Sequence, residues 1–508
     1  MSFKEVKELR KSGELENALT LAQQDLEKNI SDIWNKRSIA WVYYEFLKKY
    51  SNAENYDKFI DYLKKIKSLE LSEDENMIFD KCSFQVGKML FSLSNESIAD
   101  NSKIDELFNL VKEFHPTKPS GAYSYIFKAF NKFHKTWPNF LNFADWWGYE
   151  NFSSEDFIQT EYNGKKIMSL AEQGYISYSK KLLEGEPVES NGMLMNNAIN
   201  KELVNEFLSK LEKIIKDHPE YQYPPYFRAK FLMVLGEDTY NVLTSFLPFA
   251  KQKKNDFWVW TLFAEIYSED KELSFSCYCK ALSLRTSEAF LVKVHQEFAE
   301  MLIEKEMFSE AKTEIERIIS VREKEGWKIS NQLKQWQNQN WYNKATSKDS
   351  NHDLYLKYLK KAEKILYQDI KEEVIAVEFV NRNKKILNFV ESEKISGFFK
   401  YSNFIKNPQI GNILKVRFDG PGQDGYFKIL SLEKAGDDVK SEAIKEFRGN
   451  IRISAFRKFG FVENIFVAPN LIAENNIEND QEIKGKAILS FNKKKEEWGW
   501  KAFYVIKI

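Results

Sequence analysis

The chain has 508 residues, which is enough for two or more domains. A hydrophobic share of 43% excludes a disordered chain, and the balance of 75 basic against 75 acidic residues excludes binding of nucleic acid through bulk charge alone. No apolar run approaches the roughly 20 residues of a membrane span, and the N-terminus has no apolar signal segment, so we expect a cytoplasmic protein without membrane contact.

Residues 1–115 are rich in helix formers, with apolar residues three and four positions apart. The segment from Ser12 to Leu19 places a glycine turn, Gly13, before a second helical stripe that contains Ala18. The sequence therefore predicts antiparallel helix pairs in this region.

Residues 116–222 depart from this regularity. Proline and glycine interrupt the helices, and aromatic residues are dense, among them Trp137, Trp146 and Trp147. We expect irregular helices with longer connections. Two interpretations of the aromatic residues remain open, a packed core or a patch that faces a ligand.

Residues 223–373 repeat with a fixed period, because Ala229, Ala264 and Ala299 are each 35 positions apart. Large apolar residues surround each alanine at helical spacing. This pattern resembles the tetratricopeptide repeat (TPR), a pair of antiparallel helices with small residues where the two helices touch. The resemblance implies a helical solenoid whose groove binds a protein partner, here of unknown identity.

After Val374 the periodicity changes to short alternating runs bounded by Gly, Asn, Asp and Pro, which predicts strands. We expect two small five-stranded all-β barrels, over residues 374–438 and 443–508. The strands expected in the first are 384–390, 395–401, 410–418 and 426–432. Those expected in the second are 447–455, 459–462, 465–467, 483–491 and 500–508.

The most informative segment lies in the second barrel, in two strands around a tight turn at Glu463-Asn464. Side chains alternate between the two faces of a strand, so aliphatic and aromatic residues separate here. The face that packs a core carries Val462, Ile465 and Val467. The opposite face carries Arg457, Phe459, Phe461 and Phe466, a set typical of a surface on which bases stack.

These residues resemble the cold-shock domain and the related domains at the front of exoribonucleases of the RNase R type. The shared pattern is Arg457-Lys-Phe-Gly-Phe-Val462 followed by Ile465-Phe-Val467, with Lys458 where the family has a glycine. The resemblance covers about 60 residues. It implies an OB-fold that binds single-stranded RNA or DNA, with Phe459, Phe461 and Phe466 on the bases.

Basic residues near this surface are candidates for phosphate contacts. They are Arg452, Arg457 and Lys458, and residues 374–508 as a whole carry 23 basic against 17 acidic residues. In the first barrel, Phe399, Tyr401 and Arg417 are candidates to extend the stacking surface.

Catalysis is not expected. The five histidines are scattered through helical sequence, and no phosphate-binding glycine loop or nucleophile motif occurs. The cysteines, Cys82, Cys277 and Cys279, do not have the spacing of metal ligands or of a redox pair, so we interpret them as reduced residues that pack in the interior. We therefore predict no catalytic residues, no metal site and no cofactor.

The sequence favours a non-enzymatic bacterial adaptor that holds a protein partner in the solenoid and single-stranded nucleic acid, more readily RNA, on the barrels. One alternative is a pure protein-interaction scaffold whose barrels dock onto a partner, which buried Phe461 and Phe466 rings would favour. Another is a component of an enzyme or toxin system with a site near Trp146–Tyr149. The oligomeric state is left open.

Overall fold

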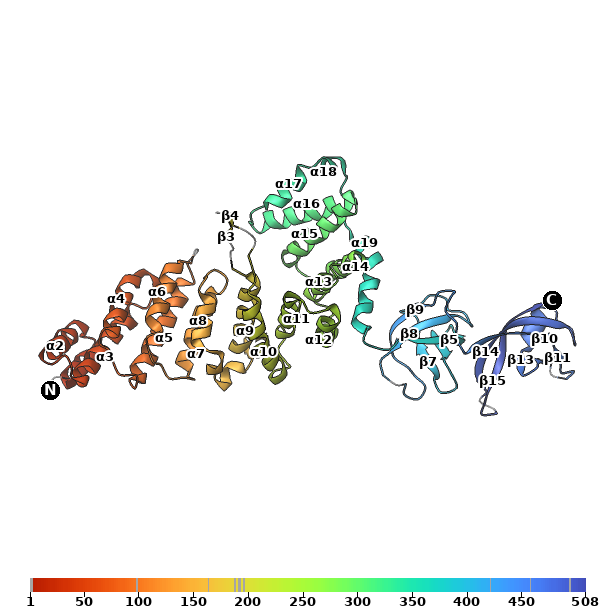
Figure 1. Cartoon of the computed structure of the whole chain (residues 1–508), viewed down its shortest axis with the longest axis horizontal. Coiled ribbons are helices and arrows are strands. Elements are labelled where there is room, and N and C mark those ends of the chain that lie inside the picture. Colours follow the sequence, from red (N-terminus) through yellow and green to blue (C-terminus); the bar gives the residue numbers. More distant parts are fainter. Residues whose placement is uncertain are drawn as a thin grey trace. The chain divides into compact units, whose positions relative to one another are not determined.

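A computed structural model describes residues 3–96, 99–162, 164–186, 189–190, 193–194, 197–420, 422–456, 458–492 and 495–508. The chain divides into two compact units, Met1–Phe249 and Ala250–Ile508. The first unit is helical, and the second holds further helices followed by two small β-barrels (Figure 1).

The first unit is built from consecutive helices with two short hairpins between them. Its α-helices are α1 (Phe3–Ser12), α2 (Leu15–Lys28), α3 (Ile33–Lys49), α4 (Tyr56–Lys67), α5 (Asn76–Leu93), α6 (Asn101–Val111), α7 (Gly121–Phe130), α8 (Phe140–Trp147), α9 (Leu170–Glu184), α10 (Lys201–Asp217), α11 (Pro224–Leu235) and α12 (Thr239–Gln252), the last of which runs across the division between the units. The hairpins are β1 (Thr160–Tyr162) with β2 (Lys165–Ile167), and β3 (Glu189–Ser190) with β4 (Met193–Leu194).

The second unit begins with further consecutive helices. They are α13 (Phe257–Ile266), α14 (Lys271–Leu282), α15 (Glu288–Glu304), α16 (Phe308–Lys324), α17 (Asn331–Gln337), α18 (Asn340–Lys344) and α19 (His352–Glu363). Sequential helices pack as pairs, α13 with α14 and α15 with α16, while α19 returns to pack along α14.

The 35-residue period has a direct structural cause. Ala264 and Ala299 lie on α13 and α15, the first helices of the pairs α13–α14 and α15–α16, and Ala229 lies on α11, which packs with α10. All three alanines are buried. A methyl side chain at these positions lets the helix approach its neighbour closely, as in a repeat of helix pairs. The predicted TPR-like helical region is confirmed.

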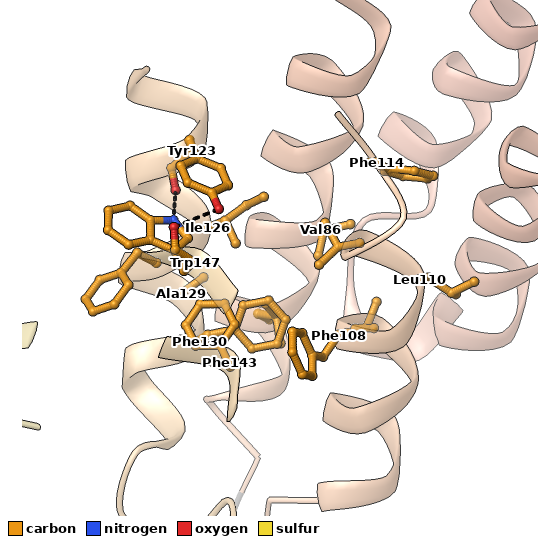
Figure 2. Packing of buried hydrophobic residues seen from close by; sticks show 14 of the residues in the cluster. Val86, Phe108, Leu110, Phe114, Tyr123, Ile126, Ala129, Phe130, Phe143 and Trp147 are labelled. Atoms are coloured by element: carbon orange, nitrogen blue, oxygen red, sulfur yellow. Dashed lines mark hydrogen bonds between the residues drawn. The ribbon is translucent and has the colours of Figure 1, made fainter. Parts of the chain in front are cut away.

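The aromatic residues of the central segment form a packed core (Figure 2). Trp137 and Trp147 are fully buried, and Trp146 packs against the same cluster. The Trp147 indole Nε1 donates to the backbone carbonyl of Tyr123 at 3.0 Å, and the Tyr123 hydroxyl donates to the carbonyl of Trp147, also at 3.0 Å. The core interpretation of this segment is therefore correct.

A buried polar cluster joins α15, α16 and α19. Glu314 is almost fully buried, and its carboxylate accepts hydrogen bonds from the Tyr355 hydroxyl and from Asn351 Nδ2. His295 Nδ1 lies 2.5 Å from the same carboxylate, and His295 Nε2 lies 3.2 Å from a Glu288 oxygen. The imidazole is thus held between two carboxylates, an arrangement that favours its protonated form.

This cluster predicts that the α15–α16 pair loses stability as the pH rises. Burial lowers the pKa of His295, but the hydrogen bonds to Glu288 and Glu314 outweigh burial and raise that pKa above 6.5. The stabilisation is complete below the unfolded pKa and is lost as the pH rises through the higher folded pKa. We expect amide hydrogen exchange, corrected for its intrinsic rate, to show lower protection of α15 and α16 at pH 8.5 than at pH 6.

The matched control for this experiment is a histidine on the surface. His115→Asn removes a half-exposed imidazole and is expected to leave the pH effect in place, whereas His295→Gln is expected to abolish it. Equal protection of the wild-type helices at both pH values would contradict a charged His295.

The first barrel is formed by β5 (Glu373–Asn381), β6 (Ile386–Val390), β7 (Ser396–Lys400), β8 (Ile413–Phe418) and β9 (Ile429–Lys434), in the order β7-β6-β5-β8-β9. A parallel bridge between Phe398 and Tyr426 joins β7 to the segment before β9 and closes the sheet. The first strand predicted for this domain begins at residue 384, so β5, which pairs with both β6 and β8, was not predicted.

The second barrel has the same topology. Its strands are β10 (Ile444–Asn450), β11 (Arg452–Ile453), β12 (Gly460–Val462), β13 (Ile465–Val467), β14 (Glu482–Asn492) and β15 (Glu497–Lys507). The order is β10-β14-β15-β13-β12-β11, and because β10 and β11 form one nearly continuous strand, the sheet closes on itself. A short helix, α20 (Pro469–Glu474), connects β13 to β14, and β13 runs parallel to β15. The predicted fold class, TPR-like helices followed by two small barrels, is confirmed.

The three cysteines are buried and free, and burial raises the pKa of each thiol. Within the described part of the chain, none of the helices combines the length and the apolar character that crossing a bilayer requires.

Candidate nucleic-acid interface

The strands β12 and β13 sort their side chains by chemistry. Val462, Ile465 and Val467 are buried and belong to the core of the second barrel. Phe461 and Phe466 are directly opposite each other on the two strands and point to the other face. The two-residue turn at Glu463-Asn464 sets this register, as the sequence predicts, because a shift by one residue would exchange the two faces.

Three phenylalanine side chains form what we call the ring cluster, Phe459, Phe461 and Phe466. Their ring centroids lie 5.5–5.7 Å apart, and the Phe461 side chain is 41% exposed while the other two are half-buried. None of the three belongs to the buried core of the barrel. The rings therefore form an outward-facing apolar surface.

Gly460 lets β12 lie close against the core. A Cβ at this position would lie 2.6 Å from Cδ1 of Ile451, so any side chain would push β12 away from the core. Glycine keeps the strand against Ile451 and leaves Phe459 and Phe461 on either side of a buried backbone position.

Cations flank the rings in register. Arg452 on β11 pairs with Phe461, and Lys501 on β15 pairs in parallel with Phe466. Paired residues of neighbouring strands point to the same face of the sheet. We therefore call the cross-strand row formed by Arg452, Phe461, Phe466 and Lys501 the outer row of the second barrel. Both cations are exposed, and neither pairs with a described carboxylate. The row offers stacking in its centre and phosphate contacts at its ends.

The C-terminal segments match known families at this point. Residues 367–430 match the S1/CSD-like domain 1 of the TOTE conflict systems, and residues 445–505 match the S1/CSD-like domain 2 of the same systems. The two barrels are S1/CSD-like domains.

The other comparisons concern the helices and the chain as a whole. Residues 222–362 match a family described as "Domain of unknown function (DUF7017)". A solved structure, "Crystal Structure of P58(IPK) TPR Domain at 2.5 A", matches at 13% identity over 72% of this chain and 97% of that chain, with a TM-score of 0.17. The TPR-like description rests on the helix pairs and their period, because so low a TM-score does not show a shared arrangement. A search of curated protein sequences gave no match.

The remaining predicted residues of the second S1/CSD-like domain lie beside the ring cluster or outside the described ranges. Lys458 is exposed, and its backbone takes a left-handed conformation with φ +55°. This conformation favours glycine. The cold-shock family has a glycine at this position. Arg457 lies outside the described residues.

Two predictions for the first S1/CSD-like domain are wrong. Phe399 is fully buried and Tyr401 is nearly so, and both belong to the core of that barrel. Phe399 pairs with Leu387, whose side chain also points inward. A ring sealed in the core has no free face for a base, so neither residue extends the stacking surface.

Arg417 has a structural function instead of the predicted one. Its Nε donates to the backbone carbonyl of Ile370 at 2.9 Å, and its Nη1 donates to a Glu372 carboxylate oxygen at 2.7 Å. These contacts attach β8 to the segment that enters the first barrel. The guanidinium is therefore already occupied by partners within the chain.

Two further exposed residues of this region were not among the predicted site residues. Lys501 is far from the motif in sequence and reaches it only through the parallel pairing of β15 with β13. Phe456 lies in the loop between β11 and β12, and its side chain is 99% exposed. Phe456 could have been noticed in the sequence as an aromatic residue that precedes the motif and does not fit the alternation of core residues.

The described ranges contain no group of three or more His, Cys, Asp or Glu side chains suited to hold a metal ion.

Proposed function

We propose that this chain is a non-enzymatic adaptor of a bacterial conflict system of the TOTE type, acting in the cytoplasm. Its second S1/CSD-like domain binds single-stranded nucleic acid, RNA in preference to DNA, and its TPR-like helices hold a protein partner. The function is tethering, which raises the local concentration of the partner at the bound strand.

The observation that supports nucleic-acid binding is the exposure of the ring cluster between two cations. Stacking on an aromatic ring contributes about 1–3 kcal/mol per base, and each phosphate contact adds salt-dependent affinity. The outer row of the second barrel has both components within one line of cross-strand neighbours.

The same observation disfavours one form of the scaffold alternative, in which the barrels dock onto the rest of the chain. A barrel that served only to dock onto other parts of the chain would bury its aromatic surface, but Phe461 is 41% exposed and Phe466 lies beside it outside the core.

The salt dependence of binding tests this proposal. Arg452, Lys458 and Lys501 together are expected to give a slope of log affinity against log salt of about −2, since each phosphate contact with a single strand contributes about −0.7. Raising the salt from about 50 to 200 mM should then weaken binding of the full chain to a labelled oligouridylate by about 20-fold.

Charge-neutralising variants make the test specific to the outer row. Arg452→Gln and Lys501→Gln should each reduce the slope by about 0.7, and Lys484→Gln, an exposed cation of the same barrel outside the row, should leave it unchanged. Equal slopes for all three variants would place the bound strand elsewhere, and the absence of any binding would refute the proposal.

A further inference from the structure

The first barrel has an outward-facing row of its own, made of residues other than those the sequence suggested. Phe379 on β5 pairs with Asn388 on β6, and Asn388 pairs with Phe398 on β7. Phe398 is in turn bridged in parallel to Tyr426. These four residues form a line across the closed sheet, which we call the outer row of the first barrel.

Burial shows that this row faces away from the core. The flanking residues Val377 and Phe399 are fully buried, whereas Phe379 is 51% exposed and Tyr426 is 42% exposed. The rings of Phe398 and Tyr426 lie 5.8 Å apart. A register shift between Val377 and Phe379 places an extra residue, Glu378, in β5, so that Phe379 points outward like Ala376 before it.

The two outer rows occupy the same place in the same topology. In each barrel the row crosses the first, second and third strands and then reaches the last strand, or the segment leading into it, through a parallel pairing. The second barrel has rings in the centre of its row and cations at the ends. The first barrel has rings at the ends, Phe379 and Tyr426, and one next to the end, Phe398. Exposed Lys400 follows two residues after Phe398 on the same face of β7.

A packed junction joins the two barrels. Ala376, Val390, Ala443 and Ile488 form one buried apolar cluster, against which Phe503 also packs. The backbone at Gly411 approaches the Phe503 ring so closely that a Cβ there would lie 2.2 Å from it. The Ser490 hydroxyl donates to the Glu378 carboxylate at 2.5 Å across the junction. Such a junction restricts independent rotation of the barrels.

Both outer rows lead to this junction. Phe379 and Asn388 are the next outward pair after Ala376 and Val390, about 7 Å along the strands at 3.3 Å per residue. In the second barrel, Lys501 pairs with junction residue Ile488. A strand that leaves one row is therefore at the edge of the other barrel.

We propose that the outer row of the first barrel is a second stacking site and that one single strand of nucleic acid occupies both rows at once. This inference rests on the proposed function of the second barrel. The ligand class is an unpaired polynucleotide long enough for two OB-type domains, each of which covers about 4–16 nucleotides. The junction fixes the distance between the two sites, so the second binding event is intramolecular and increases the affinity for long strands alone.

The test measures binding of labelled oligouridylates, and of the matching oligothymidylates, to the full chain by fluorescence anisotropy. The oligonucleotides are about 6 and 20 nucleotides long, lengths that suit one and two such domains. Phe398→Ala/Tyr426→Ala is expected to weaken binding of the long strand by at least about 10-fold and to leave the short strand within about 2-fold, because the second barrel still binds it. Phe379→Ser alone should give a smaller loss in the same direction. Phe404→Ala, which removes an exposed ring of the first barrel outside the row, should change neither value.

The outcomes separate this inference from the proposed function. Wild-type affinity of the Phe398→Ala/Tyr426→Ala variant for the long strand overturns the second site and leaves the proposed function standing. An equal loss for short and long strands also overturns it, because the two barrels then form no length-dependent tandem site. Failure of the wild-type chain to bind any of the oligonucleotides refutes both.

Discussion

Replacing Phe461 and Phe466 together by alanine is expected to weaken binding of a single-stranded oligouridylate by about 30-fold or more. The two side chains are directly paired on β12 and β13, with ring centroids 5.7 Å apart, and they form the centre of the outer row of the second barrel. Each stacked base contributes about 1–3 kcal/mol, so the loss of two rings amounts to at least about 2 kcal/mol. Titration of the labelled strand with full-length protein measures the change.

The barrel should remain folded in this variant, because neither ring belongs to its buried core. Tyr504→Ala is the matched control, since it removes another exposed ring of the same barrel outside the row, and its affinity should equal that of the wild type. Wild-type affinity in the double variant would show that the bases stack elsewhere or not at all.

The second large effect is expected in the helical core of the first unit. Trp147→Ala should destabilise this unit by about 3–5 kcal/mol, because it empties a fully buried site and leaves the Tyr123 carbonyl without the indole that donates to it. Hydrogen exchange of α7 and α9, followed with increasing urea, reports the loss of stability locally.

Trp34→Ala provides the control for this prediction. The Trp34 side chain is 62% exposed, and the Arg37 guanidinium carbon lies 4.8 Å from the centroid of its ring. Removing this ring should therefore lower the free energy of unfolding by less than about 1 kcal/mol. Since the ring cluster lies in the other unit, Trp147→Ala is expected to retain oligouridylate binding at a temperature where the barrels stay folded. Similar stability of the two tryptophan variants would contradict the core assignment.

The alternation of β12 and β13 was predictable because the pattern is local. With a turn of two residues, the faces of Val462 and Phe461 follow from the sequence alone, and their burial agrees. The 35-residue spacing of alanines was equally informative, since close packing of helices requires a small residue at each contact.

The first barrel shows where local patterns fail. Phe398 and Phe399 are adjacent, and only the register of β7 against β6 shows that the first points outward and the second into the core. Phe379 was missed because β5 was not predicted as a strand, and an extra residue in β5 also shifts the alternation that would place this ring outward. A search for strict alternation of apolar and polar residues does not detect a bulge of this kind.

Long-range pairing accounts for the remaining omissions. Lys501 reaches Phe466 through a parallel pairing across more than thirty residues, and α19 returns to pack on α14 after the four helices α15 to α18. The Glu314 cluster likewise joins three helices whose sequences give no sign of one another. Contacts of this type depend on the assembled fold and not on any single segment.

Photo-crosslinking tests the central claim most directly. The full chain is irradiated in complex with a single-stranded oligouridylate, and mass spectrometry identifies the crosslinked peptides. Bases that stack on the ring cluster are predicted to crosslink within residues 459–466, at Phe461 or Phe466, and an excess of unlabelled strand should suppress the signal. Crosslinks confined to the helices, or none at all in β12 and β13, would contradict the account.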